Sequence, residues 1–242
     1  MPSVSQPTSW APLALLKQRA ADYAIQFVES GMVLGLGGGS TAALAIAAIA
    51  ERLRAGELQR IVSVPCSTQV EAEARRLGVP LTTLEDHLQI DLTINGADEV
   101  DPQLNLIKGG GGALPREKIV AQATAREVII VDETKLSRTL GARHTLPVGV
   151  LPFGWRTQED FLRSLGARAT LRTAVHGPAF TTDQGNLILD CDFGVLDDPV
   201  GLALQLQGRD GIVAHGLFLG LASDVVVGTS AGIRHLRRDE PY

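Results

Sequence analysis

The stretch that decides the fold lies near the middle of the chain and reads IDLTINGADEVD, residues 90–101. Its apolar residues alternate up to Ile94 and then give way to an amide and carboxylates, which predicts a strand that delivers Asn95 and Asp98 to the edge of a sheet. The segments LIKGGGG, residues 106–112, and PREK, residues 115–118, follow closely. Four consecutive glycines cost backbone entropy, which favours a loop whose main chain closely approaches a ligand. Pro115 suits the first turn of a helix, where Glu117 lies near the positive end. Together these residues predict a site for a small polar substrate.

A second glycine-rich turn occurs earlier in the chain. Residues 32–36 are an apolar run, GLGGGST occupies residues 35–41, and residues 42–53 have a strong helical pattern. A strand, a glycine turn and a helix that starts at Ser40 and Thr41 predict an anion site, because free backbone N–H groups and the helix dipole point at the ligand. Neither named nucleotide motif fits, since Ser40 replaces the third glycine of a dinucleotide fingerprint and no P-loop lysine precedes it. A plain strand-to-helix turn is the alternative, but the coincidence of hydroxyls and glycines favours phosphate.

Predicted strands and helices alternate through the first half of the chain. We expect helices over residues 11–29, 67–77 and 117–125 and strands over residues 61–64, 90–94 and 128–131. This order predicts a mostly parallel sheet with helices on both faces. Ligands of such sheets bind outside the carboxyl ends of the strands. Residues 37–41, Asn95 to Asp98 and Lys135 all follow such ends, so we expect them to share one site.

The order of elements changes after residue 146. Strands over residues 148–151, 167–174, 186–189 and 212–214, with helices over 155–165 and 198–206, give the βαββαβ order of a ferredoxin-like unit. The predicted fold class is therefore α/β, with a mostly parallel Rossmann-like sheet and a smaller inserted ferredoxin-like domain. The expected division is residues 1–146 and 216–242 for the larger α/β domain and residues 147–215 for the small one. The apolar segments 216–221 and 224–227 are expected to return to the first sheet.

Composition narrows the class of protein. Hydrophobic residues make up 45% and charged residues 20%, which is ordinary for a soluble globular protein, and the net charge of -5 argues against a nucleic-acid partner. The densest basic cluster, residues 234–238, is interpreted as a solvated terminus. The first ten residues lack the pattern of a signal peptide, and no apolar run is long enough for a membrane span. Two cysteines fit a reducing cytoplasm, and five dispersed histidines indicate no metal site.

Taken together, these motifs resemble ribose-5-phosphate isomerase of the A type. The resemblance runs from Lys17 to Ile233 and is carried by residues 35–41, 95–101, 107–112 and 116–118, with Lys135. It implies a cofactor-free, cytoplasmic homodimer or homotetramer of the pentose phosphate pathway. Its activity would be the interconversion of ribose 5-phosphate and ribulose 5-phosphate through an enediolate.

The resemblance also implies roles for individual residues. Glu117 would be the base that moves a proton between C2 and C1, and Lys108 with the neighbouring amides would stabilise the enediolate. Asp98 would help to open the sugar ring, and Asn95 completes the catalytic set. The expected substrate-binding residues are Gly38, Gly39, Ser40, Thr41, Asn95, Gly96, Ala97, Asp98, Lys108, Gly109, Gly110, Gly111 and Lys135, with Lys17 as a secondary candidate.

Two positions depart from the family's usual pattern. Asn95 stands where the family usually has Asp, and Gly38 stands where it usually has Thr. An amide forms hydrogen bonds but does not ionise. The alternative function is therefore a sugar-phosphate-binding protein with weakened catalysis. A sugar-phosphate deaminase or a CoA transferase is less favoured, because the match runs through the catalytic stretch itself.

Overall fold

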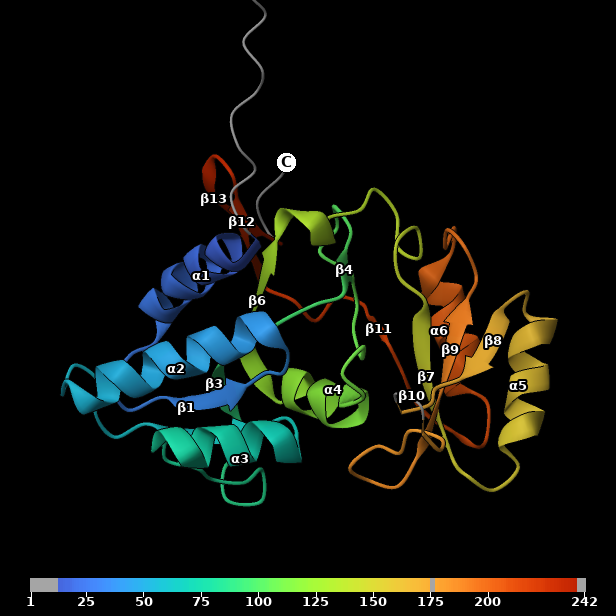
Figure 1. Cartoon of the computed structure of the whole chain (residues 1–242), viewed down its shortest axis with the longest axis horizontal. Helices are drawn as coiled ribbons and strands as arrows, with labels where there is room; N and C mark the ends of the chain where they lie inside the picture. The colour runs from blue at the N-terminus through green and yellow to red at the C-terminus, as the bar shows by residue number, and fades with distance from the viewer. Residues whose placement is uncertain (1–12, 175–176, 239–242) are drawn as a thin grey trace, which may run out of the picture.

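The computed structural model describes residues 13–174 and 177–238 (Figure 1). The first two residues of the helix expected over 11–29 lie outside this range. The central sheet has the strand order β13-β12-β6-β3-β1-β2. Its strands are β1 (Val33–Leu36), β2 (Val62–Pro65), β3 (Ile90–Asn95), β6 (Thr124–Asp132), β12 (Asp224–Thr229) and β13 (Gly232–Arg237). All neighbouring pairs are parallel except β12 and β13, which confirms the predicted mostly parallel sheet.

Four helices cover this sheet. Helices α1 (Leu13–Ala24) and α2 (Ser40–Arg54) lie on one face, and α3 (Thr68–Leu77) and α4 (Leu114–Gln122) lie on the other (Figure 1). Helix α2 buries an alanine- and isoleucine-rich stripe that includes Ile46 and Ile49. Helix α3 begins where the Ser67 hydroxyl accepts a hydrogen bond from the backbone N–H of Val70 and ends at Gly78, whose φ is 78°. Both ends agree with the sequence pattern, because a serine cap and a left-handed glycine are common helix boundaries.

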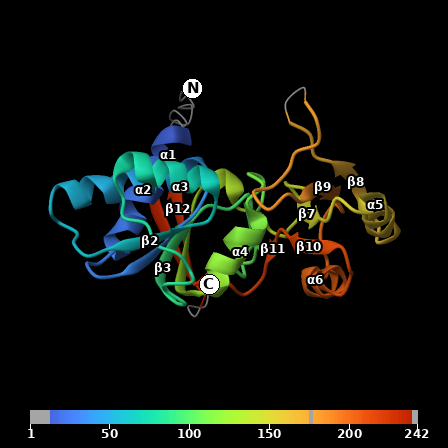
Figure 2. The same cartoon turned by 90° about the horizontal axis from the view of Figure 1, so that it is seen from below.

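The second sheet belongs to the ferredoxin-like unit. Its strands β7 (Leu146–Val150), β8 (Arg168–Leu171), β9 (Leu187–Asp192) and β10 (Ile212–His215) are all antiparallel, in the order β10-β7-β9-β8. Helices α5 (Trp155–Ser164) and α6 (Pro199–Gln207) complete the βαββαβ order. Figure 2 shows this unit beside the central sheet, with α4 between the two. The boundaries of the two domains remain a prediction.

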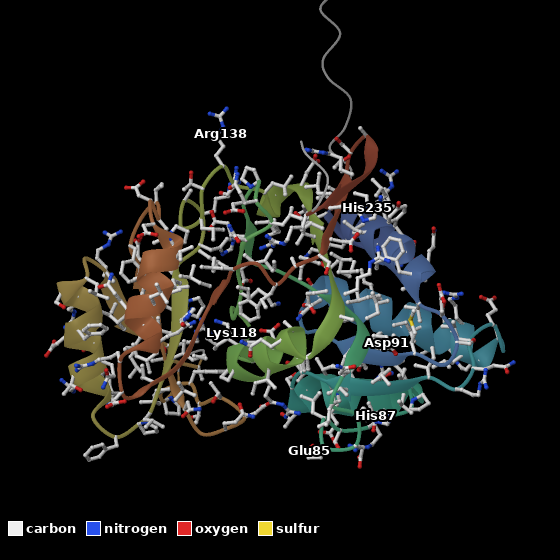
Figure 3. All side chains as sticks on the ribbon, turned by 180° about the vertical axis from the view of Figure 1, so that it is seen from behind. Glu85, His87, Asp91, Lys118, Arg138 and His235 are labelled. Atoms are coloured by element: carbon white, nitrogen blue, oxygen red, sulfur yellow. The ribbon has the colours of Figure 1, made fainter. Side chains whose placement is uncertain are left out.

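A third, small sheet corrects one expectation. Strands β4 (Glu99–Val100), β5 (Leu106–Ile107) and β11 (Leu217–Phe218) form it, in the order β11-β5-β4. Of the two segments expected to rejoin the first sheet, only the one that contains β12 does so. The earlier segment pairs instead with β5, and Lys118 of α4 donates hydrogen bonds to the carbonyls of His215 and Leu217 at its start (Figure 3).

Three other expectations were wrong in detail. Helix α1 ends at Ala24 and continues as a short 3₁₀ turn, η1 (Ile25–Phe27). The expected helix 117–125 stops at Gln122, because Thr124 already pairs with Ile90 in the β3–β6 register. The basic cluster at residues 234–238 is not a solvated terminus: residues 232–237 form the edge strand β13, which carries His235 (Figure 3). The His235 side chain contacts Asp224 at 2.6 Å.

The helices carry no membrane signature. In the ranges 13–174 and 177–238, no helix combines the length and the apolar character that crossing a bilayer requires.

Candidate active site

The turn between β1 and α2 is shaped by the strand beneath it. A Cβ atom on Gly37 would lie 2.2 Å from the Asn95 side-chain oxygen and 2.4 Å from the Asn95 Cα atom, so only glycine fits. Gly39 has a φ of 92° and precedes α2 without a side-chain cap. Helix α2 therefore presents the N–H groups of its first turn, with the hydroxyls of Ser40 and Thr41, to the space above the turn. This arrangement attracts an anion.

Asn95 is the side chain that holds this turn. Its Oδ1 atom accepts hydrogen bonds from the N–H groups of Gly38 at 3.2 Å and Gly96 at 2.8 Å. The side chain is completely buried and does not line the cavity above it. The structure therefore places Asn95 under the predicted site and separates it from the other predicted residues, which reach the cavity.

A buried ion pair lies beside the turn. Lys108 Nζ donates a hydrogen bond to Glu117 Oε1 at 2.9 Å, and both side chains are more than nine-tenths buried. The same ammonium donates to the carbonyl of Gly96. Burial lowers the pKa of Lys108, but the combined effects of Glu117, Glu127 and Cys66 raise it, so the pKa of Lys108 lies above its ordinary value. The site thus holds a fixed cation next to a carboxylate, and residues 13–174 and 177–238 provide no hydrogen-bond donor to the second oxygen of that carboxylate.

Glu117 owes its place to the start of α4. The helix begins at Leu114 with Pro115 in its first turn, as predicted, and Glu117 is the acidic residue of that turn. The N-terminal end of a helix favours a carboxylate through the positive end of its dipole. The start of α4 thus directs Glu117 toward Lys108, which follows β5.

The glycine loop after β5 is held from two sides. Asp98 Oδ2 accepts a hydrogen bond from the N–H of Gly110 at 2.8 Å. Arg172 of the ferredoxin-like unit donates to the carbonyls of Gly109 and Gly110 and pairs with Asp190. Because the loop is fixed before any ligand arrives, its amides are preorganised donors.

Two lysines flank the predicted phosphate turn, which is the turn of residues 37–39 between β1 and α2. Lys17 of α1 donates a hydrogen bond to Ser40 Oγ at 3.0 Å, and Lys135 follows β6 in the short turn η2 (Glu133–Lys135). Both line the same cavity as Ser40 and Thr41. A ligand that carries two negative charges would therefore meet a helix N-terminus and two ammonium groups.

The ferredoxin-like unit closes the site with a loop that sequence reasoning missed. Phe180, Thr181, Thr182 and Asp183 line the cavity. Asp183 accepts hydrogen bonds from the N–H and the hydroxyl of Thr68, both at 2.8 Å. These residues showed only a turn pattern in the sequence, since nothing local places them against α3.

These elements enclose one cavity of about 560 Å³. Of the predicted residues, it is lined by Lys17, Gly38, Gly39, Ser40, Thr41, Gly96, Ala97, Asp98, Lys108, Gly109, Gly110, Gly111, Glu117 and Lys135. Ser67, Gln69 and Glu73 of the α3 region also line it and were not predicted. Three separate strand ends thus meet at one site, as the parallel sheet predicted.

Two further observations bear on the chemistry. The Cys66 thiol is buried, and burial raises its pKa to about 12, so it is not an activated nucleophile. Among the residues that the structure describes, no three His, Cys, Asp or Glu side chains group as potential metal ligands.

Comparisons with known proteins agree on one family. A sequence profile described as ribose 5-phosphate isomerase A (phosphoriboisomerase A) matches residues 62–232. The ribose-5-phosphate isomerase A of Desulfatibacillum aliphaticivorans is 54% identical over 222 residues, which cover 92% of this chain and 96% of that protein.

Solved structures agree as well. A D-ribose-5-phosphate isomerase in complex with phospho-erythronic acid has a TM-score of 0.92 and 39% identity, over 94% of this chain and all of that one. The ribose 5-phosphate isomerase of Plasmodium falciparum has a TM-score of 0.91 and 36% identity, over 94% and 100% of the two chains.

Proposed function

Because the chain belongs to the ribose 5-phosphate isomerase A family, we propose that its cavity interconverts ribose 5-phosphate and ribulose 5-phosphate. The observation that carries this assignment is the buried Lys108–Glu117 pair, which borders the same cavity as the N-terminus of α2. Isomerisation needs a base beside a fixed cation, and a sugar phosphate needs an anion site at some distance from both. The cavity contains all three.

The proton transfer is assigned to Glu117. The carboxylate takes the proton from C2 of the open-chain aldose, the electron pair of that C–H bond forms the C1–C2 double bond, and the carbonyl electron pair moves onto O1 to give the enediolate. The proton of O2 then moves to O1, the same carboxyl returns its proton to C1, and the electron pair left on O2 forms the C2 carbonyl of the ketone. One carboxylate above both carbons suffices for both steps. Lys108 and the amides of Gly109 and Gly111 stabilise the negative charge that develops on the enediolate oxygens, while the Gly110 amide is already bound to Asp98.

Binding of the phosphate is assigned to the N-terminus of α2. Ser40, Thr41 and the first-turn amides of α2 supply donors, and Lys17 and Lys135 supply charge. The solved relative that binds phospho-erythronic acid supports a phosphate-bearing sugar acid as a ligand of this type of site. A fixed phosphate orients the reacting carbons, which is worth about 7–11 kcal/mol in the best intramolecular cases.

Asp98 and Asn95 have different tasks in this proposal. Asp98 lines the cavity and assists ring opening, while Asn95 orients the turn of Gly38 from beneath. Asn95 and Gly38 motivated the weakened-catalysis alternative. Asn95 is buried outside the cavity wall, which argues against a role in moving a proton. The comparisons support neither that alternative nor a deaminase or a CoA transferase.

Conversion of ribose 5-phosphate to the ketose by the purified chain tests the proposal directly. Glu117→Gln should lower kcat by about 100- to 10,000-fold, the usual contribution of a positioned base, with little change in KM. Glu73→Gln is the matched control, because Glu73 also lines the cavity but pairs with Arg76. Equal activity of the two variants would remove Glu117 from the role of base.

We also propose a cytoplasmic location, a homodimer or homotetramer, and a division of the chain into two domains at residues 146/147 and 215/216. Light scattering behind size-exclusion chromatography measures the oligomeric state. Expression of residues 147–215 alone tests whether the small domain folds independently.

A further inference from the structure

A second buried carboxyl lies behind the ion pair and has no role in the steps above. Glu127 of β6 is 2% exposed. Within residues 13–174 and 177–238, neither of its oxygens makes a hydrogen bond, and the Nδ2 atom of Asn95 makes none either. Buried polar atoms are almost always paired in folded proteins. Two unpaired oxygens and one unpaired amide nitrogen in the same region therefore call for a common explanation.

The strand register brings these groups to one face of the sheet. Glu127 pairs with Thr93 across β3 and β6, and Asn95 follows Thr93 by two residues, so its side chain points to the same face. Two residues in such diagonal positions on neighbouring strands are close enough for a long side chain of one to contact the other. Asn95 Oδ1 already accepts hydrogen bonds from the N–H groups of Gly38 and Gly96. Only the NH₂ group of Asn95 is therefore left to bind the carboxyl of Glu127.

The charges around Glu127 come from several elements. Lys108 after β5, Glu117 of α4 and Cys66 after β2 all interact with it electrostatically, while its β3 neighbour Thr93 does not ionise. Burial, together with the nearby Glu117 carboxylate, raises the pKa of Glu127 to about 8 against the opposing effects of Lys108 and the Asn95 amide. At neutral pH the carboxyl is therefore mostly protonated, and Glu117 is the anion next to Lys108.

We propose that Glu127 is a positioning residue of the isomerase: its carboxyl holds the Asn95 amide in the orientation that fixes the phosphate turn, and its uncharged form leaves Lys108 available to the enediolate. The proposal rests on the proposed function for its kinetic consequences. An amide suits position 95, because an aspartate there would face a second carboxyl.

Ionisation of Glu127 should impair catalysis. A second negative charge near Lys108 opposes the charge that develops on the enediolate. The kcat/KM for ribose 5-phosphate should then fall severalfold between about pH 7 and about pH 9, with an apparent pKa near that of Glu127. Glu127→Gln should keep most of the activity at neutral pH and lose this alkaline decline.

Two control variants separate this effect from others. Lys118 also has a pKa of about 8, lowered by burial, so Lys118→Met must retain the decline if Glu127 causes it. Glu85→Gln removes a negative charge from an exposed loop and must retain it too (Figure 3). A decline that persists in Glu127→Gln, or that disappears in Lys118→Met, overturns the proposal.

Two measurements do not depend on activity. Infrared spectroscopy of the wild-type protein at neutral pH should show a protonated-carboxyl band that fades as the pH rises, and a spectrum without it overturns the proposal even if Glu127→Gln does not fold. In thermal unfolding, Asn95→Asp should lower Tm, and Glu127→Gln should restore it in that background, because coupled residues give non-additive effects. Additive shifts contradict the pairing. If the wild-type protein lacks isomerase activity, the proposed function fails, while these two measurements still test the Glu127–Asn95 pair.

Discussion

Replacing Gly37 by alanine should strongly destabilise the protein, whereas the same change at Gly38 should not. The new Cβ atom at Gly37 would lie 2.2 Å from Asn95 Oδ1 and 2.4 Å from Asn95 Cα. Carbon atoms in contact are normally about 3.5–4.0 Å apart, so the overlap exceeds about 1 Å. Because one of the clashing atoms belongs to the backbone of β3, a side-chain rotation does not relieve it.

The size of the effect follows from this geometry. Overpacking costs about 1–3 kcal/mol in typical cores, and the backbone clash places Gly37→Ala at the upper end, about 3 kcal/mol. For a chain of this size each kcal/mol lowers Tm by about 2–4 °C, so Tm should fall by about 6–12 °C. A Cβ atom on Gly38 meets nothing closer than 3.7 Å, so Gly38→Ala should stay within about 1 kcal/mol of the wild-type protein.

Thermal unfolding of the two variants, followed by circular dichroism, measures this difference. Steady-state kinetics adds a functional test, because a displaced turn weakens the hold on the phosphate. The KM of Gly37→Ala should rise about tenfold, which corresponds to about 1.4 kcal/mol of binding free energy. If Gly37→Ala and Gly38→Ala unfold at the same temperature, the steric account of the turn is wrong.

Three further predictions concern the surroundings of the site. Gly38→Thr should fold normally and lower KM, since the Cβ has room and the hydroxyl adds a donor; an unchanged or higher KM in the isomerase assay would contradict this. Asp183→Ala should raise KM severalfold, because it removes both hydrogen bonds to Thr68. The control variant Asp197→Ala, in an exposed turn, should leave KM unchanged. Equal KM values for the two variants would show that the loop at Asp183 does not close the site. Burial lowers the pKa of Lys118 to about 8 in the folded protein, whereas a lysine in an unfolded chain has a pKa of about 10.4. Between these two pH values the unfolded state binds more protons than the folded state. The contribution of Lys118 to the free energy of unfolding should therefore rise with pH over this range. Lys118→Met should flatten that part of the pH profile in urea unfolding, and an unchanged slope would show that Lys118 does not cause it.

Local signals in the sequence were sufficient for most of the site. Ser40, Asp98 and Lys135 each follow a strand, and the carboxyl ends of parallel strands meet at one edge, so their convergence could be predicted without coordinates. Pro115 likewise marked the start of α4 and so placed Glu117.

What could not be predicted depends on contacts between distant segments. One of the two hydrogen bonds that orient the Asn95 side chain comes from Gly38, 57 residues away. The loop at Asp183 reaches the site through Thr68, 115 residues away. The edge strand β13 looked like a basic tail because its exposed positions carry Arg234 and Arg237, while its pairing with β12 is a tertiary property.

The path of the chain through the central sheet has a consequence for its synthesis. Strand β6 ends at Asp132, and its neighbour β12 begins only at Asp224, with the whole ferredoxin-like unit made in between. Until then, the edge of β6 has unpaired N–H and C=O groups, and such edges are where nascent chains aggregate. Closing a connection of about 90 residues also costs about 4 kcal/mol of chain entropy. A ribosome that slowed after residue 132 would lengthen the time for which this edge of β6 stays unpaired. Early folding of the small domain brings β6 and β12 together, so it should protect the chain from aggregation during translation.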